Sequence, residues 1–246
     1  MSEGLSSVHR ALEVLRALGA GPMRVQDVAE ALGKEKTQVS RTLKVLAEAG
    51  FAERDADLSY RLGWGLFALA GQAGDERLLH QAPEVLRGLV RRLGEAAYLT
   101  VRGADTAVTV LTERPGRALQ AHEWIGRTTP LSCTSSGRAL LTGLSDAELA
   151  EVLGDAPLPG TDRAPRDLPA LLRRVRAERA AGHVVAAEEY EPGLVAVAAP
   201  VRDFRGAVVA ALNVSAPVFR LPPDALEPVV AEVADAAGRL SAALGG

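Results

Sequence analysis

VQDVAEALGKEKTQVSRTLKVLAEAG, residues 25–50, is the stretch that decides the fold of the N-terminal part of the chain. Apolar residues recur at helical spacing on both sides of Gly33, which predicts a short helix and then a longer one from about Glu35 to Ala49. Gly33 suits the turn between them, because glycine readily adopts the left-handed conformation that ends many helices. A short helix, a tight turn and a longer helix form a helix-turn-helix arrangement.

The longer helix has two faces of different chemistry. Val39, Leu43 and Leu46 form an apolar stripe that we expect to face a core. The opposite side carries hydroxyl groups and cations without any acid, and such side chains contact phosphates and base edges of DNA. The residues predicted to contact DNA from this helix are Lys36, Thr37, Gln38, Ser40, Arg41 and Lys44. A solvated helix face and a plain protein-docking module remain the alternatives.

The flanking segments complete a winged helix-turn-helix domain over residues 1–62. An amphipathic helix is predicted over about Ser6 to Ala17. Two short strands within residues 51–62 surround an acidic turn, which predicts a hairpin of the kind called a wing. Arg54 and Arg61 lie near the base of this hairpin, so we expect them to touch backbone phosphates.

Composition narrows the function further. The net charge of −3 over 246 residues argues against a globally basic, nucleic-acid-coating protein. All three lysines, Lys34, Lys36 and Lys44, nevertheless fall in the one segment that holds the predicted recognition helix. No signal peptide and no run of roughly 20 apolar residues is evident, and the single cysteine, Cys133, suits a reducing compartment. We therefore expect a cytoplasmic protein without a membrane partner.

The rest of the chain predicts an α+β domain with an antiparallel sheet. Residues 63–80 form a linker helix region, and residues 81–246 form the second domain. Strands come first, helices follow, and strands return before a closing helix, which is the order of an α+β fold. Strands are predicted at Ala97–Arg102, Thr106–Arg114, Ala118–Trp124, Leu194–Val201 and Ala207–Ser215. Helices are predicted at Glu76–Leu93, Thr134–Thr142, Asp167–Ala181 and Pro222–Leu244.

Three segments carry a resemblance to a known family. Residues 6–63, GRTTPLSCTSSGRALLTGLSDAEL at residues 126–149, and residues 179–221 with their AAEEYEPGLVAVAAPV resemble the IclR family of bacterial regulators. Gly33-Lys34-Glu35-Lys36 departs from the family's usual apolar-proline step, which leaves the operator sequence open. The resemblance implies a GAF-like effector-binding domain and a homodimer or homotetramer. It also implies transcription regulation, with repression favoured over activation, through operator DNA and a small-molecule effector.

The resemblance also implies where the effector binds. Residues 132–136 offer hydroxyl groups at a predicted helix start, for which simple N-capping by Thr134 or Ser135 is the alternative. The positions that match the family's effector site are Ser135, Ser136, Ala186, Leu194, Ala196, Asn213 and Ser215, and we add Trp124 and Leu131 as apolar walls. Ala186 and Ala196 replace larger or polar groups of members that bind keto acids, which favours an aromatic or bulky organic acid or amide.

The sequence gives little support for an enzymatic function. No nucleophile elbow, phosphate-binding glycine loop or dinucleotide fingerprint is present. Cys133 lacks an identifiable base, and the four histidines show no metal-ligand spacing. Glu188 and Glu189 are adjacent, and we interpret them as structural rather than catalytic. No catalytic residue, metal or cofactor is predicted. An enzyme on a DNA-binding anchor and a ligand-free interaction module remain the rival hypotheses.

Overall fold

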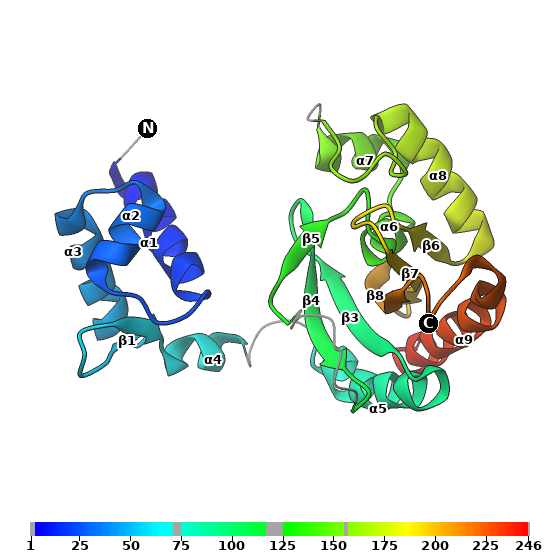
Figure 1. The fold of residues 1–246 in the computed structure, drawn as a ribbon, viewed down its shortest axis with the longest axis horizontal. Helices are drawn as coiled ribbons and strands as arrows, with labels where there is room; N and C mark the ends of the chain where they lie inside the picture. Colours follow the sequence, from blue (N-terminus) through cyan, green and yellow to red (C-terminus); the bar gives the residue numbers. More distant parts are fainter. Residues whose placement is uncertain (1–2, 71–74, 117–124, 155–156, 246) are drawn as a thin grey trace. The chain divides into compact units, whose positions relative to one another are not determined.

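The chain folds into two units. The computed structural model describes residues 3–70, 75–116, 125–154 and 157–245 (Figure 1). Contacts divide it into Met1–Gly74 and Asp75–Gly246. This boundary falls inside the segment 63–80 that was predicted as a linker region, so its first helix groups with the first unit and its last residues with the second.

The first unit is a winged helix-turn-helix domain, as predicted. Its elements are α1 (Glu3–Leu18), α2 (Val25–Leu32), α3 (Lys36–Glu48), β1 (Ala52–Arg54), β2 (Tyr60–Leu62) and α4 (Trp64–Ala70). Gly33 has a φ of 60° and ends α2 in the left-handed conformation. The antiparallel strands β1 and β2 form the wing, and Met23 bridges to Tyr60 beside them. Val39, Leu43 and Leu46 of α3 are buried in the core of this domain.

The second unit is built on one antiparallel sheet, which confirms the predicted fold class. Its strands are β3 (Ala96–Arg102), β4 (Thr106–Glu113), β5 (Thr128–Pro130), β6 (Val184–Ala187), β7 (Leu194–Arg202) and β8 (Val208–Pro217). They lie in the order β5-β4-β3-β8-β7-β6. The predicted strand Ala118–Trp124 lies outside the described residues. The short strands β5 and β6 were not predicted.

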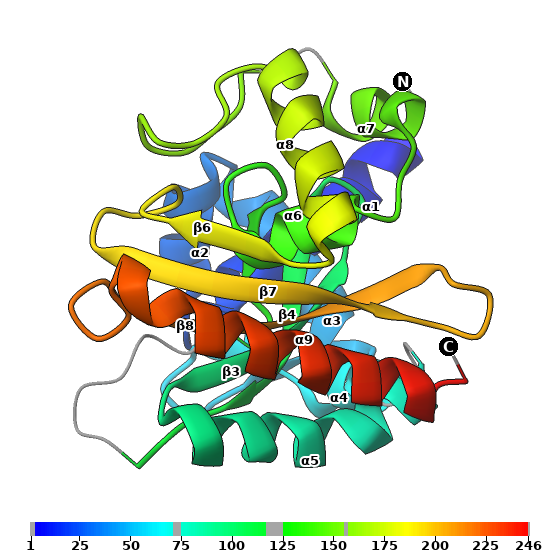
Figure 2. The same ribbon diagram turned by 90° about the vertical axis from the view of Figure 1, so that its right-hand side faces the viewer.

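Helices cover both faces of this sheet. They are α5 (Glu76–Leu93), α6 (Ser135–Leu141), α7 (Asp146–Leu153), α8 (Leu168–Ala181), the short 3-10 helix η1 (Pro223–Ala225) and α9 (Leu226–Ala243). The long helices α5 and α9 pack against one face, and α6 packs against the other (Figures 1 and 2). Among the described residues, no helix combines the length and the apolar character that a bilayer crossing requires.

The two faces of the sheet have different side chains. Successive residues of a strand point to opposite faces. In β8, Leu212 and Val214 belong to the apolar core with α5 and α9, whereas Asn213 and Ser215, which alternate with them in sequence, face the other way. The β3 residue opposite Asn213 is Tyr98. The face toward α6 therefore carries polar groups in the middle of a buried sheet.

Gly137 allows α6 to sit close to the chain that precedes it. A Cβ atom at this position would lie 2.5 Å from the carbonyl oxygen of Leu131 and 2.6 Å from its Cα. Gly238 in α9 is the contrasting case, because a Cβ there would meet nothing within 4 Å. The close approach of α6 therefore depends on the missing side chain of Gly137.

We predict opposite effects of alanine at these two helical glycines. Gly137→Ala forces backbone atoms apart and lowers the free energy of unfolding by about 1–3 kcal/mol. Gly238→Ala raises it by about 0.5–1 kcal/mol, because alanine loses less backbone freedom in a helix. Denaturant titration of both variants checks this. Equal stability of the two would contradict the packing described for α6.

Candidate functional site

A cavity lies on the polar face of the sheet in the second unit. Its lining comes from the start of α6, from strands β3, β4, β5, β6, β7 and β8, and from the segment after β6. About 530 Å³ of space around this lining is free of protein atoms, and part of that space is open to solvent. The lining residues predicted from the sequence are Ser135, Ser136, Ala186, Leu194, Ala196, Asn213 and Ser215. The structure thus brings together positions that lie up to 80 residues apart in sequence.

Two residues predicted for this site are not among its lining. Leu131 is 1% exposed and belongs to the apolar cluster beneath α6 and α8. It contributes instead to the lining of a separate hollow that Pro157 and Pro159 also line, because its side chain belongs to the apolar core rather than to the polar face. Trp124 lies outside the described residues.

Six lining residues were missed by the sequence analysis. They are Tyr98, Thr100, Thr109, Thr129, Thr134 and Tyr190. Tyr98 and Thr100 lie on β3, whose partner strand is β8. The sequence shows that Tyr98 and Thr100 alternate with the apolar residues Ala97, Leu99 and Val101. It does not show that Tyr98 and Thr100 face a cavity, because that follows from the pairing of β3 with a strand more than 100 residues later.

The described lining carries both polar and apolar groups but no charged side chain. Its groups are hydroxyls, one amide, two phenols, two alanine methyl groups and the Leu194 side chain. The Thr100 hydroxyl donates to Asn213 Oδ1 across 3.4 Å. Thr134 caps α6, since its Oγ1 accepts from the Gly137 N–H at 3.1 Å and donates to the Pro130 carbonyl at 2.7 Å. Capping by Thr134, the simpler interpretation of this segment, therefore holds alongside the cavity. Such a site suits a ligand with few charges.

Arg138, in the second turn of α6, is fully buried behind the cavity wall. Its guanidinium donates to the Glu178 carboxylate at 2.9 Å and to the Glu189 carboxylate at 2.6 Å. It also donates to the carbonyl oxygens of Ser132 at 3.3 Å and Val185 at 3.1 Å. A buried guanidinium needs partners for its fixed set of N–H groups, and here they come from three chain segments besides α6. Arg138 thereby joins the segments that form the cavity wall.

The two adjacent glutamates have structural partners, as predicted. Glu189 binds Arg138, while Glu188 accepts from the Gly193 N–H at 3.0 Å and holds the turn into β7. Glu188 has a φ of 57°, so its backbone is in the left-handed region and is not part of a strand. Burial raises the pKa of Glu178 to about 7, even though Arg138 opposes the rise.

Cys133 behaves as a buried apolar residue. It is fully buried, and burial raises the pKa of its thiol to about 11. A thiol that stays protonated at neutral pH is a poor nucleophile. This agrees with the interpretation of Cys133 as structural.

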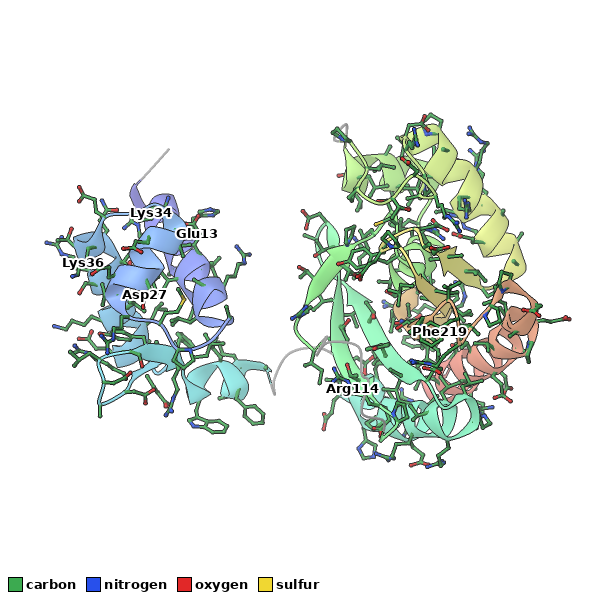
Figure 3. The ribbon with its side chains drawn as sticks, in the orientation of Figure 1. Glu13, Asp27, Lys34, Lys36, Arg114 and Phe219 are labelled. Carbon is green, nitrogen blue, oxygen red and sulfur yellow. The ribbon has the colours of Figure 1, made fainter. Side chains whose placement is uncertain are left out.

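The first unit exposes a continuous polar face on α3. Lys36, Thr37, Gln38, Ser40, Arg41 and Lys44 are all exposed. Lys36 lies on the outer side of the helix, whereas Lys34 lies beside Glu13 of α1 at 3.8 Å (Figure 3). Lys44 is loosely paired with Glu48 at 3.9 Å, and both side chains are largely exposed. This face offers cations and hydroxyls in the geometry of a recognition helix.

The two arginines of the wing already have partners within the protein: carboxylates for Arg61 and an aromatic ring for Arg54. Arg61 forms ion pairs with Glu53 at 2.7 Å and with Asp55 at 3.3 Å. Arg54 lies over the ring of Tyr60 at 5.6 Å. A phosphate contact by Arg61 therefore competes with its two carboxylate partners, whereas Arg54 keeps its guanidinium at the surface.

Comparisons with known proteins cover both units. The family model described as IclR helix-turn-helix domain matches residues 7–56, and the one described as bacterial transcriptional regulator IclR C-terminal matches residues 72–242. The HTH-type transcriptional repressor AllR of Klebsiella pneumoniae is 30% identical, over 99% of this chain and 91% of that protein. An IclR regulator structure from Alicyclobacillus acidocaldarius is 25% identical with a TM-score of 0.82, covering 98% and 99% of the two chains. An IclR homologue from Microbacterium hydrocarbonoxydans, complexed with 4-hydroxybenzoate, is 24% identical with a TM-score of 0.84, covering 97% and 98%.

We predict that Arg138→Met destabilises the second unit strongly. The substitution keeps most of the volume but leaves the buried Glu178 carboxylate without its ion-pair partner and leaves Glu189 with only the part-exposed Arg174, at 3.2 Å. We expect this to cost about 3–5 kcal/mol of unfolding free energy. Arg176→Met is the matched control, because Arg176 pairs with Asp146 at the surface and should change stability by at most about 1 kcal/mol. Denaturant unfolding measures both. If Arg138→Met lowers the free energy of unfolding by as little as Arg176→Met does, the buried cluster contributes little to stability.

Proposed function

Because this chain belongs to the IclR family of bacterial transcriptional regulators, we propose that it is a repressor whose operator binding is controlled by a small molecule in the cavity described above. Family membership makes it a DNA-binding regulator rather than an enzyme. The observation that carries the proposal is that each unit has its own candidate binding surface: a cationic α3 face in one and a cavity lined by hydroxyl and amide groups in the other. Repression is proposed because AllR, the similar protein, is a repressor.

The effector we propose is an aromatic or otherwise bulky organic acid or amide. Ala186 and Ala196 leave space on the floor of the cavity, and no cation in the described lining compensates a dianion. A single carboxylate or an amide finds enough neutral donors among the hydroxyl groups. The Microbacterium homologue holds 4-hydroxybenzoate, which supplies a concrete probe of this class.

We further propose that the protein is a homodimer, or a tetramer built from dimers, in the cytoplasm where its operator lies. Helix α4 supports this because Trp64 is 74% exposed, Phe67 71% and Leu69 54%. A helix with such large exposed apolar side chains suits a partner surface, and two-fold dimers read paired half-sites.

Light scattering should show a dimer or a tetramer at micromolar concentration, because covering the apolar side chains of α4 favours association. A Trp64→Glu, Phe67→Glu double variant should dissociate toward monomers. Val45→Glu, which charges another exposed apolar residue on α3, should leave the assembly unchanged. A wild-type monomer would contradict the proposal.

For the DNA-binding face, we predict that Arg41→Ala weakens operator binding by about 1–3 kcal/mol if its guanidinium reads a guanine. Lys44→Ala should weaken binding to all sequences alike and make the salt dependence shallower, because it removes one phosphate contact. Fluorescence anisotropy with DNA from upstream of the protein's own gene measures both. Arg166→Ala, an exposed arginine of the second unit, is the control. Unchanged affinity in the Arg41→Ala, Lys44→Ala double variant would refute the assignment.

For the cavity, we predict that Ser135→Trp blocks effector binding, because Ser135 is 2% exposed at the cavity wall and indole would occupy the space. In wild-type protein, 4-hydroxybenzoate at millimolar concentration should raise the melting temperature by mass action and reduce operator affinity. The variant should lose both responses while it still binds DNA. If 4-hydroxybenzoate still raises the melting temperature of Ser135→Trp, the ligand binds outside this cavity.

A further inference from the structure

Two buried hydroxyl groups of the second unit lack hydrogen-bond partners. Among the described residues, Tyr98 and Thr112 are the two whose buried side-chain oxygens have no partner. They are register partners across β3 and β4, so both lie on the polar face of the sheet. Buried polar groups in folded proteins are almost always paired, and an unpaired one needs an explanation such as a ligand.

Tyr98 differs from Thr112 in one respect. It lines the cavity, whereas Thr112 does not, and its side chain is 3% exposed. Asn213, whose Oδ1 is already bound by Thr100, lies directly opposite Tyr98 on β8. Tyr98 therefore places an unused hydroxyl beside the amide at the centre of the cavity wall.

The protonation state of this phenol makes it a donor. Burial raises the pKa of Tyr98, and the nearby Ser215 hydroxyl offsets that rise only in part, without reaching hydrogen-bond geometry with the phenol oxygen. The phenol accordingly keeps its proton at neutral pH. In a cavity whose described lining holds no charged side chain, this phenol is a neutral donor that no group of the protein already uses, so it can satisfy an oxygen atom of a ligand.

We infer that Tyr98 is a specificity-determining residue: its hydroxyl donates a hydrogen bond to a carboxylate or carboxamide oxygen of the effector. This inference rests on the proposed function, because it takes the cavity as the effector site. Tyr98 then selects ligands with an acceptor at this position, since a ligand without one leaves the hydroxyl unpaired.

The free protein provides the first test. Tyr98→Phe removes only the hydroxyl, so a group without a partner is lost and the melting temperature should stay the same or rise. Thr112→Val is the matched control, which removes the other unpaired hydroxyl outside the cavity and should behave in the same way. A clear fall in the melting temperature of Tyr98→Phe would show that the hydroxyl is bonded within the protein, and would overturn the inference.

Ligand binding provides the second test. Benzoate and benzamide carry the acceptor oxygen, and toluene lacks it. Titration calorimetry of the full chain should show that Tyr98→Phe binds benzoate and benzamide about tenfold more weakly than wild type, as expected for one lost hydrogen bond. Toluene binding should not change, and Thr112→Val should bind all three probes as wild type does.

The outcomes separate this inference from the proposed function. Equal binding of benzoate and benzamide by Tyr98→Phe and wild type would overturn the role of Tyr98 and leave the cavity as the effector site. If wild type binds none of the three probes, the proposed effector class fails, and the melting temperature of free Tyr98→Phe alone decides whether the hydroxyl lacks a partner.

Discussion

The buried guanidinium of Arg138 is the constraint on which the second unit depends. It cannot lose its charge, so it must be surrounded by acceptors wherever it is buried. Glu178 comes from α8, Glu189 from the segment after β6, and two carbonyl groups from the chain before α6 and from β6 itself. The chain before α6, β6 and the segment after β6 contribute the cavity residues Thr134, Ala186 and Tyr190, and α8 packs against α6. The geometry of the cavity wall is therefore set by a group that does not itself line the cavity.

Strand alternation explains why a cavity can exist inside this domain. One face of the sheet gives its Leu and Val side chains to the core with α5 and α9, so stability does not require the other face to be apolar. That other face combines the hydroxyls of β3 and β8 with Ala186 and Ala196. Small side chains leave space, and polar ones make the space selective. The first unit has no share in this arrangement and keeps its own core.

The local elements could be predicted from the sequence, but the site could be predicted only in part. Gly33, the α3 stripe and the hairpin follow from spacing and turn chemistry within a few residues. Asn213 and Ser215 were found through the family resemblance and their two-residue spacing. Tyr98 was missed because its role depends on pairing with β8, and the partners of Arg138 were missed because they are 40 and 51 residues away. Leu131 was misplaced because an apolar residue next to a site gives no sign of which side it faces.

Hydrogen–deuterium exchange of Arg138→Lys tests the central role of the buried guanidinium most directly. Lysine keeps the charge but cannot donate to two carboxylates and two carbonyl groups in the planar arrangement that arginine uses. We predict faster exchange in residues 131–137 and 185–190 together, with unchanged protection in α5, α9 and the middle of β8. Unchanged exchange in those two segments, or faster exchange spread evenly over the domain, would contradict the account, because Arg138 would then not be what holds the cavity wall.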